Sequence, residues 1–203
     1  MKKAIFILCL IILPFTCYAA AVNSNGLAAL TETNKEQFQQ IQDMLSKAHL
    51  LSGHFQQTQK IKLLSNPLLS SGHFVLSREK GLAWYQEKPF GSKLIVTTNK
   101  IEQQLENNPP LIITKEQQPI VFYFSNLFLS IFNGDTKNIT DYFNIYFTGN
   151  TTNWTIVLKS SGPPLNKAIT SIEMSGAKYI NSITINQAQQ NQTIIQFSNV
   201  KES

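Results

Sequence analysis

Few side chains in this 203-residue chain could carry out catalysis. Its three histidines are His49, His54 and His73. His54 and His73 could meet across a hairpin and bind a metal ion. A zinc site, however, usually has three or four ligands at short spacing, and no aspartate or glutamate lies within four positions of either histidine. We therefore favour two ordinary strand-surface histidines over a metal site.

Motifs for nucleophilic and phosphate chemistry are also missing from the sequence. It contains no Gly-x-Ser-x-Gly motif and no glycine-rich phosphate loop after a predicted strand. Acidic residues such as Glu102 and Glu173 stand singly in polar stretches, whereas glycoside hydrolysis uses a pair of carboxylates. We therefore expect a protein that is not an enzyme and that needs no cofactor or metal ion.

Arg78 stands out because it is the only arginine, against sixteen lysines. The alternation of the strand predicted around it places Arg78 on the same face as Phe74 and Leu76. A charge on an apolar face costs free energy unless it finds acceptors. The five N–H donors of the guanidinium suit backbone carbonyls at a helix end or the head group of a cargo. A slip of the alternation at the strand end would instead turn Arg78 toward water.

One helix and a series of strands must position these residues. Apolar residues recur at three- and four-residue steps over residues 32–48, which predicts an amphipathic helix. The period then falls to two, which predicts antiparallel strands with short turns, and a curved sheet or barrel would give them a core. The repeat Ser-Gly-His-Phe at 52–55 and 71–74 indicates two similar strands. The predicted strands cover residues 54–61, 72–78, 82–87, 93–98, 142–147, 154–159, 168–175, 178–186 and 192–200.

An almost wholly apolar segment, residues 121–132, interrupts the strands and is followed by Asn133-Gly134-Asp135. It suits a helix that ends at a glycine, but apolar residues surround its axis. Together with the apolar faces of the strands, it exceeds what one terminal helix could cover. Either the sheet closes on itself around a filled core, or it leaves an apolar cavity with this segment, including Phe124 and Phe128, as a lid.

The N-terminus resembles an export signal. Two lysines precede an uncharged apolar run over residues 4–15, which is too short for a bilayer that needs about 20 apolar residues. Small residues follow, so we predict a signal peptide over residues 1–19, cleaved after Ala19 or Ala21. An uncleaved anchoring or buried helix, or a lipoprotein signal at Cys17, would be the alternatives.

Cleavage would change the composition of the mature chain, which we expect to form a single domain over residues 20–203. Both cysteines, Cys9 and Cys17, would be removed, so that neither a disulfide nor a thiol would remain. Loss of the two N-terminal lysines lowers the formal net charge by two, from +5 to +3. Such a mild excess does not indicate a nucleic-acid partner, and about 180 residues are enough for one hydrophobic core.

Three neighbouring motifs carry a family resemblance. Residues 55–60 read Phe-Gln-Gln-Thr-Gln-Lys, residues 71–78 read Ser-Gly-His-Phe-Val-Leu-Ser-Arg, and residues 81–84 read Gly-Leu-Ala-Trp ahead of Pro89. This succession resembles the periplasmic outer-membrane lipoprotein carrier family, the LolA-like proteins. That family has a Phe-x-Gln strand, a Gly-x-Phe/Leu strand that ends in arginine, and an aromatic-x-Trp strand before a proline. The C-terminal half is similar to the compact branch of the family, so that the resemblance covers nearly all of the mature chain.

The resemblance implies a mainly β protein with helices (α+β), an unclosed antiparallel β-barrel or half-barrel whose apolar concave face is covered by helices. It implies a soluble, monomeric carrier in the periplasm that shields acyl chains of lipoproteins, or of a related lipid, between an inner-membrane donor and an outer-membrane acceptor protein. Arg78 matches the arginine that holds the helical lid of such carriers closed. Strand alternation and the resemblance together assign the cargo-binding face to Phe55, Phe74, Leu76, Leu82, Trp84, Leu94, Val96, Phe124 and Phe128.

Two positions depart from the family pattern, and other functions stay open. Glu79 stands where a proline commonly follows the arginine, and Leu82 replaces the aromatic residue two positions before Trp84. The cargo could be a lipoprotein, another lipid or an amphiphilic secondary product. A β-rich accessory factor of envelope assembly that binds only protein, or a hydrolase with an unrecognised site, would be the alternative functions.

Overall fold

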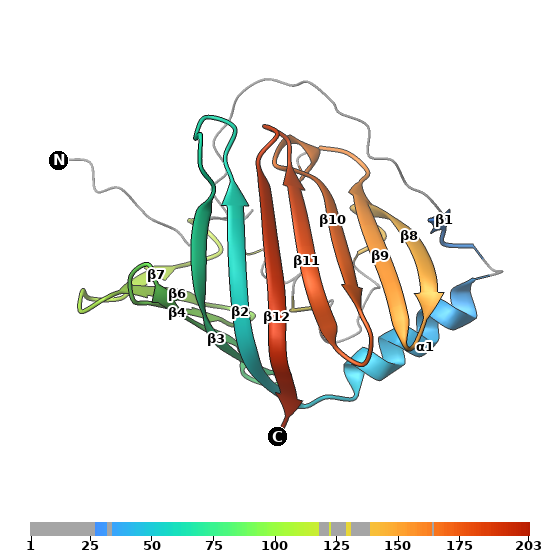
Figure 1. Ribbon diagram of the computed structural model, residues 1–203, viewed down its shortest axis with the longest axis horizontal. Coiled ribbons are helices and arrows are strands. Elements are labelled where there is room, and N and C mark those ends of the chain that lie inside the picture. Colours follow the sequence, from blue (N-terminus) through green and yellow to red (C-terminus); the bar gives the residue numbers. More distant parts are fainter. Residues whose placement is uncertain (1–26, 32–33, 118–121, 123–128, 131–138, 164) are drawn as a thin grey trace.

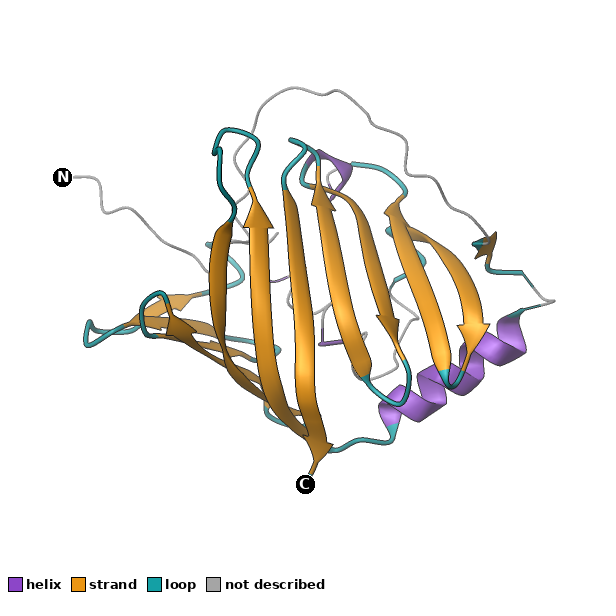
Figure 2. Ribbon diagram, in the orientation of Figure 1, coloured by secondary structure: helices purple, strands orange, loops and turns teal. Residues whose placement is uncertain are grey.

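The computed structural model describes residues 27–31, 34–117, 122, 129–130, 139–163 and 165–203. These residues include one sheet, the helix α1 and a short 3-10 helix (Figures 1 and 2). The elements in chain order are β1 (Ala28–Ala29), α1 (Lys35–Ser46), β2 (Leu50–Lys60), β3 (Leu68–Ser77), β4 (Gly81–Lys88), β5 (Ser92–Val96), β6 (Ile101–Leu105), β7 (Leu111–Ile113), β8 (Phe143–Asn150), β9 (Asn153–Ser160), η1 (Leu165–Lys167), β10 (Ile169–Gly176), β11 (Ile180–Gln187) and β12 (Gln192–Glu202).

The sheet has the strand order β1-β8-β9-β10-β11-β12-β2-β3-β4-β5-β6-β7, and every neighbouring pair is antiparallel. β1 and β7 lie at its two edges and do not pair with each other, so the sheet is not closed. It curves strongly, with β4 to β7 turned away from the plane of β8 to β12 (Figure 1). The predicted fold class, an unclosed antiparallel barrel with a helix, is confirmed.

α1 is amphipathic, as its sequence periodicity predicts. Its buried side chains are Phe38, Ile41, Gln42 and Leu45, which are spaced at the three- and four-residue steps of one helix face. The helix is shorter at both ends than the predicted range of 32–48. The Phe38 ring meets the Phe147 ring of β8 edge to face, with centroids 5.8 Å apart, so α1 is anchored to the sheet by its apolar face.

All nine predicted strands are present, and three short strands were missed. The missed strands are β1, β6 and β7, which together hold only ten residues. In β6 the sequence Ile-Glu-Gln-Gln-Leu is mostly polar, although Ile101 and Gln103 are buried. A buried glutamine interrupts the apolar alternation by which a half-buried strand is recognised.

The segment predicted as a helix over residues 121–132 lies mostly outside the described residues, as do Phe124 and Phe128. Phe122, Leu129 and Ser130 are described and helical. Phe122 is fully buried and Leu129 is almost so, and both belong to the same hydrophobic core as Ile41 of α1 and Phe55 of β2. Within the part of the chain that is described, no helix combines the length and the apolar character needed to cross a bilayer.

Candidate functional site

The concave face of the half-barrel is lined at one end by an aliphatic row that runs straight across β2 to β7. Each member is the cross-strand partner of the next, because the register pairs Leu51 with Leu76, Leu76 with Leu82, and so on along the row. All six side chains are at most 7% exposed. The row consists of Leu51, Leu76, Leu82, Val96, Ile101 and Ile113.

An aromatic cluster lies beside the aliphatic row, toward the middle of the strands. It comprises Phe55, Phe74, Trp84 and Phe197, from four adjacent strands. The Phe55 ring stacks on Trp84 with centroids 3.7 Å apart, and Phe197 stands edge-on to Phe74 at 5.3 Å. Offset stacking and edge-on contacts of this kind add to the energy of apolar burial, so the cluster is a rigid part of the concave face.

The short repeat Ser-Gly-His-Phe explains how this cluster fits. β2 and β3 pair so that Gly53 lies opposite Phe74 and Phe55 lies opposite Gly72. A Cβ atom on Gly53 would lie 2.9 Å from Cε1 of Phe74, and one on Gly72 would lie 1.9 Å from the backbone oxygen of Tyr85. Each glycine therefore provides space that a larger residue would take from a neighbouring ring or strand.

A polar end follows beyond the aromatic cluster, formed by Gln57, Gln59, Ser70 and Thr193. Gln57, Gln59 and Thr193 are at most 8% exposed, and Ser70 is partly buried. Strand alternation places all four on the concave side, in line with Phe55, Phe74 and Phe197. The concave face thus changes along the strands from aliphatic through aromatic to polar and uncharged.

α1 packs on the sheet chiefly at β8, and its Leu45 borders a small cavity on the concave side. A cavity of about 10 Å³ lies between the helix and the sheet, which is room for about one water molecule. The cavity is lined by Leu45, Leu51, Phe74, Tyr179, Ile180, Phe197 and Val200.

The predicted cargo-binding residues come together on this face as far as they are described. Phe55, Phe74, Leu76, Leu82, Trp84 and Val96 are all at most 7% exposed, and Leu94 packs against the same core. Phe197 was not singled out from the sequence, although Thr193, Ile195 and Phe197 alternate along the predicted last strand. Its place in the cluster depends on the pairing of β12 with β2, which no local pattern reveals.

Arg78 lies just beyond the end of β3, in the turn that leads to β4. Its side chain is exposed, and its backbone N–H donates a hydrogen bond to the carbonyl of His49 at 3.0 Å. The alternation that would have placed it beside Leu76 ends at Ser77, because the turn begins there. The lid-holding role of Arg78 remains a prediction.

His54 of β2 and His73 of β3 lie on the convex side of the sheet. His54 and His73 are cross-strand partners, and Nδ1 of His73 lies 2.7 Å from Oε1 of Glu87 while its ring stacks on Tyr85 at 4.7 Å. Among the described residues, no three histidine, cysteine, aspartate or glutamate side chains gather where they could hold a metal ion. The contacts of His73 are therefore a surface hydrogen bond to Glu87 and a ring stack on Tyr85.

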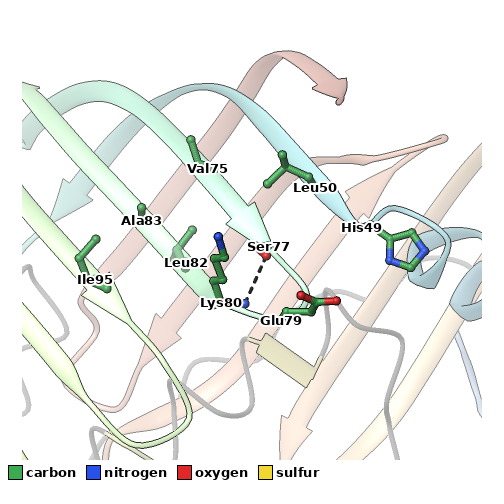
Figure 3. A pocket seen from close by; sticks show the side chains of 10 residues that line it. His49, Leu50, Val75, Ser77, Glu79, Lys80, Leu82, Ala83 and Ile95 are labelled. Atoms are coloured by element: carbon green, nitrogen blue, oxygen red, sulfur yellow. Dashed lines mark hydrogen bonds between the residues drawn. The ribbon is translucent and has the colours of Figure 1, made fainter.

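A larger hollow of about 500 Å³ opens near the turn between β3 and β4 (Figure 3). Leu50, Val75, Ala83 and Ile95 contribute to its lining, and each alternates with a residue of the aliphatic row or the aromatic cluster. They therefore point to the convex face. Because it lies on the other side of the sheet, this hollow is not part of the concave site.

Comparison with known proteins identifies the family. The family model described as outer membrane lipoprotein carrier protein LolA matches residues 46–203, whereas no curated protein matches the sequence. Among solved structures, a LolA superfamily protein of Nitrosomonas europaea is similar with 8% identity and a TM-score of 0.46, covering 83% of this chain and 93% of its own. LprF of Mycobacterium bovis is similar with 12% identity and a TM-score of 0.40, covering 85% and 95%. The family model spans well over half of the sequence, and the chain therefore belongs to the LolA family of outer membrane lipoprotein carrier proteins.

Proposed function

We propose that the protein is a periplasmic carrier. It shields the acyl chains of lipoproteins, or of a related lipid, while this cargo passes from the inner to the outer membrane. Membership of a lipoprotein carrier family supports a carrier in general terms. The observation that carries the proposal is the concave face itself. An apolar row crosses β2 to β7, and its side chains are buried in the same hydrophobic core as Ile41 of α1, Phe122 and Leu129.

The energetics suit reversible carriage. An acyl chain gains roughly 0.8 kcal/mol for each methylene removed from water, so about fifteen methylenes would gain on the order of 12 kcal/mol. Displacing α1 would expose Phe38, Ile41 and Leu45, at about 1.5–3 kcal/mol for each side chain. α1 thus competes with the cargo for the concave face and lowers the apparent affinity of the protein for the cargo. A carrier needs such a limit because it must also release what it binds.

Export completes the proposal. Residues 1–19 would act as a signal peptide cleaved after Ala19 or Ala21, leaving a single mature domain over residues 20–203. The mature protein would act as a monomer, loading from an inner-membrane donor and unloading to an outer-membrane acceptor protein.

The proposal is tested by isolating the full-length gene product from the periplasmic fraction of a Gram-negative host. We expect an intact mass that begins at Ala20 or Val22, and acyl lipids in an organic extract of the pure protein. Hydrogen–deuterium exchange should show that the α1 amides lose protection when a long-chain amphiphile is added, because the cargo displaces the helix.

Other results would contradict carriage. A lipid-free protein whose α1 stays protected at saturating amphiphile would favour an accessory factor that binds only protein. Turnover of an ester substrate would favour the hydrolase alternative. Retention of Met1 in the membrane fraction would contradict the signal peptide.

Arg78→Leu is expected to slow the release of a fluorescent lipidated peptide about fivefold. If the guanidinium holds the cover closed, its loss weakens the competitor of the cargo by about 1 kcal/mol, which is modest because the side chain is exposed. The release rate of Arg78→Lys should fall between those of the wild type and Arg78→Leu, because an ammonium group cannot reproduce the planar guanidinium fork. Lys80→Leu in the same turn is the matched control. Equal release rates for Arg78→Leu and Lys80→Leu would show that Arg78 is an ordinary surface charge.

A further inference from the structure

The hairpin formed by β2 and β3 ends in a tip, residues 60–69, that exposes four leucines to solvent. Leu63 is 92% exposed, and Leu64, Leu68 and Leu69 are between 43% and 64% exposed. Single exposed apolar side chains are common in soluble proteins, whereas a contiguous apolar group marks an interaction surface. Four exposed leucines on one short tip therefore indicate that the tip has a partner.

The tip extends past the paired parts of the neighbouring strands, at the upper rim of the sheet in Figure 1. On one side, the pairing of β3 with β4 reaches only as far as Ser71. On the other side, the pairing of β2 with β12 reaches only as far as Lys60. Leu68 and Leu69 point to opposite faces of the hairpin, and both are exposed. Neither face of the tip is therefore covered by a neighbouring strand.

Hydrogen bonds hold the tip in a defined turn. The backbone N–H of Leu64 donates to the carbonyl of Ile61 at 2.9 Å. The backbone N–H of Lys62 donates to Oδ1 of Asn191, also at 2.9 Å, and so ties the tip to the turn before β12. These bonds fix the backbone on either side of Leu63, so that its side chain is presented to solvent.

The charged groups of this hairpin are cationic. Lys60 and Lys62 are exposed beside the leucines, and the sequence has no aspartate or glutamate between Asp43 and Glu79. The turn before β12, residues 188–191, reads Ala-Gln-Gln-Asn and is uncharged. A lysine can lay its stem along apolar surface while its ammonium group reaches a phosphate, and each lysine near an anionic bilayer strengthens binding. Apolar side chains bordered by lysines are typical of segments that lie in a membrane interface.

We propose that the β2–β3 tip docks on the surface of an anionic phospholipid bilayer, with its leucines among the acyl chains and its lysines at the phosphates. This surface is separate from the concave face, and its role goes beyond carriage because it brings the protein itself onto a membrane. The docking is reversible, since even a complete myristoyl chain gives only marginal membrane binding. Its electrostatic part weakens as salt screens the lysines.

The test measures co-sedimentation of the mature protein with phosphatidylcholine vesicles that contain or lack phosphatidylglycerol. We expect the wild type to bind the vesicles with phosphatidylglycerol more tightly, and high salt to reduce this difference. Leu63→Ser should weaken binding about tenfold, because one leucine no longer leaves water. Its melting temperature should be unchanged, since the side chain is exposed. Leu111→Ser is the matched control, because Leu111 is an exposed leucine at the start of β7, outside the tip, and should leave binding unchanged.

A second pair of variants tests the lysines. Lys60→Gln/Lys62→Gln should weaken binding to vesicles with phosphatidylglycerol about thirtyfold and leave binding to phosphatidylcholine alone unchanged. Lys47→Gln/Lys80→Gln makes the same change in net charge at the opposite rim, where α1 ends and β3 turns into β4. It should have little effect. Equal losses in the two double variants would overturn the proposal, because they would show attraction to the net charge of the whole protein.

Insertion of the tip is measured with a fluorescent label. Residues 20–203 contain no cysteine, so Leu63→Cys provides a single site for a nitrobenzoxadiazole label. Its emission should shift to the blue on vesicles with phosphatidylglycerol and be quenched by brominated acyl chains, whereas a label at Leu111→Cys should show neither change. A label at Leu63→Cys that stays unquenched would overturn insertion.

Three further results would contradict docking on a bilayer. The first is a wild type that does not bind vesicles with phosphatidylglycerol, which would leave the carrier function standing because the concave face is not involved. The second is an equal loss of binding for Leu63→Ser and Leu111→Ser. The third is a dimer of the wild type, seen without lipid by sedimentation velocity, that becomes a monomer in Leu63→Ser, because the leucines would then bind a second copy of the chain.

Discussion

Trp84→Ala is expected to lower the free energy of unfolding by about 3–5 kcal/mol. The side chain is only 4% exposed and lies at the centre of the aromatic cluster, stacked on Phe55 and beside Phe74 and Phe197. Removing the indole would leave a cavity in the middle of the concave face, and the surrounding rings could collapse into it only in part. Urea denaturation followed by circular dichroism measures the loss.

Tyr85→Ala is the matched control for this change. Tyr85 is the next residue of β4, faces the convex side and stacks on His73 rather than on the core. We expect it to cost about 1 kcal/mol, as is typical for a partly exposed side chain. The loss of unfolding free energy for Trp84→Phe should fall between those of Trp84→Ala and Tyr85→Ala, because phenylalanine retains a ring that can stack on Phe55. Similar losses for Trp84→Ala and Tyr85→Ala would mean that the concave face is not the centre of the core.

Gly72→Ala is expected to destabilise the protein by at least about 3 kcal/mol, beyond the usual range for one added methyl group. The new Cβ would lie 1.9 Å from the backbone oxygen of Tyr85. Backbone cannot turn aside as a side chain can, so β3 and β4 would have to separate at this point. Thermal denaturation should show a correspondingly lower midpoint, with the aromatic fluorescence of the Trp84 region altered.

Gly91→Ala provides the comparison, because nothing lies within 4 Å of a Cβ built on Gly91. The same substitution should be neutral or slightly stabilising there, since alanine restricts the unfolded chain more than glycine does. If Gly72→Ala were as well tolerated as Gly91→Ala, β3 and β4 would not approach each other as closely as described.

Local periodicity was sufficient to predict most of the sheet and much of the concave face. The alternation of Phe74, Leu76, Leu82 and Trp84 with outward residues follows from burial on one side of a strand. The alternation did not predict correctly which way a side chain faces where a strand ends. Alternation assigned Arg78 to the apolar face because it cannot detect that the turn starts after Ser77, and there the side chain is exposed instead.

Other parts of the site depend on contacts between residues far apart in the chain. Phe197 joins Phe55 only because β12 pairs with β2, and the buried Gln59 and Thr193 meet for the same reason. In sequence, glutamine and threonine look like surface residues, since they are mostly exposed in proteins. Their burial could not be predicted from the residue types.

The pairing of β12 with β2 also sets the order in which the protein can fold. Phe55 and its partner Phe197 are far apart in sequence, yet they lie at the centre of the sheet. The two halves of the half-barrel can be joined only after the last strand has been made, and contacts of long sequence separation form slowly. A chain whose central seam closes last completes its core only after the whole polypeptide has been made, although the local hairpins on either side of the seam can form earlier. If the proposed signal peptide directs export, this delay would leave the core open until the last strand has crossed the membrane.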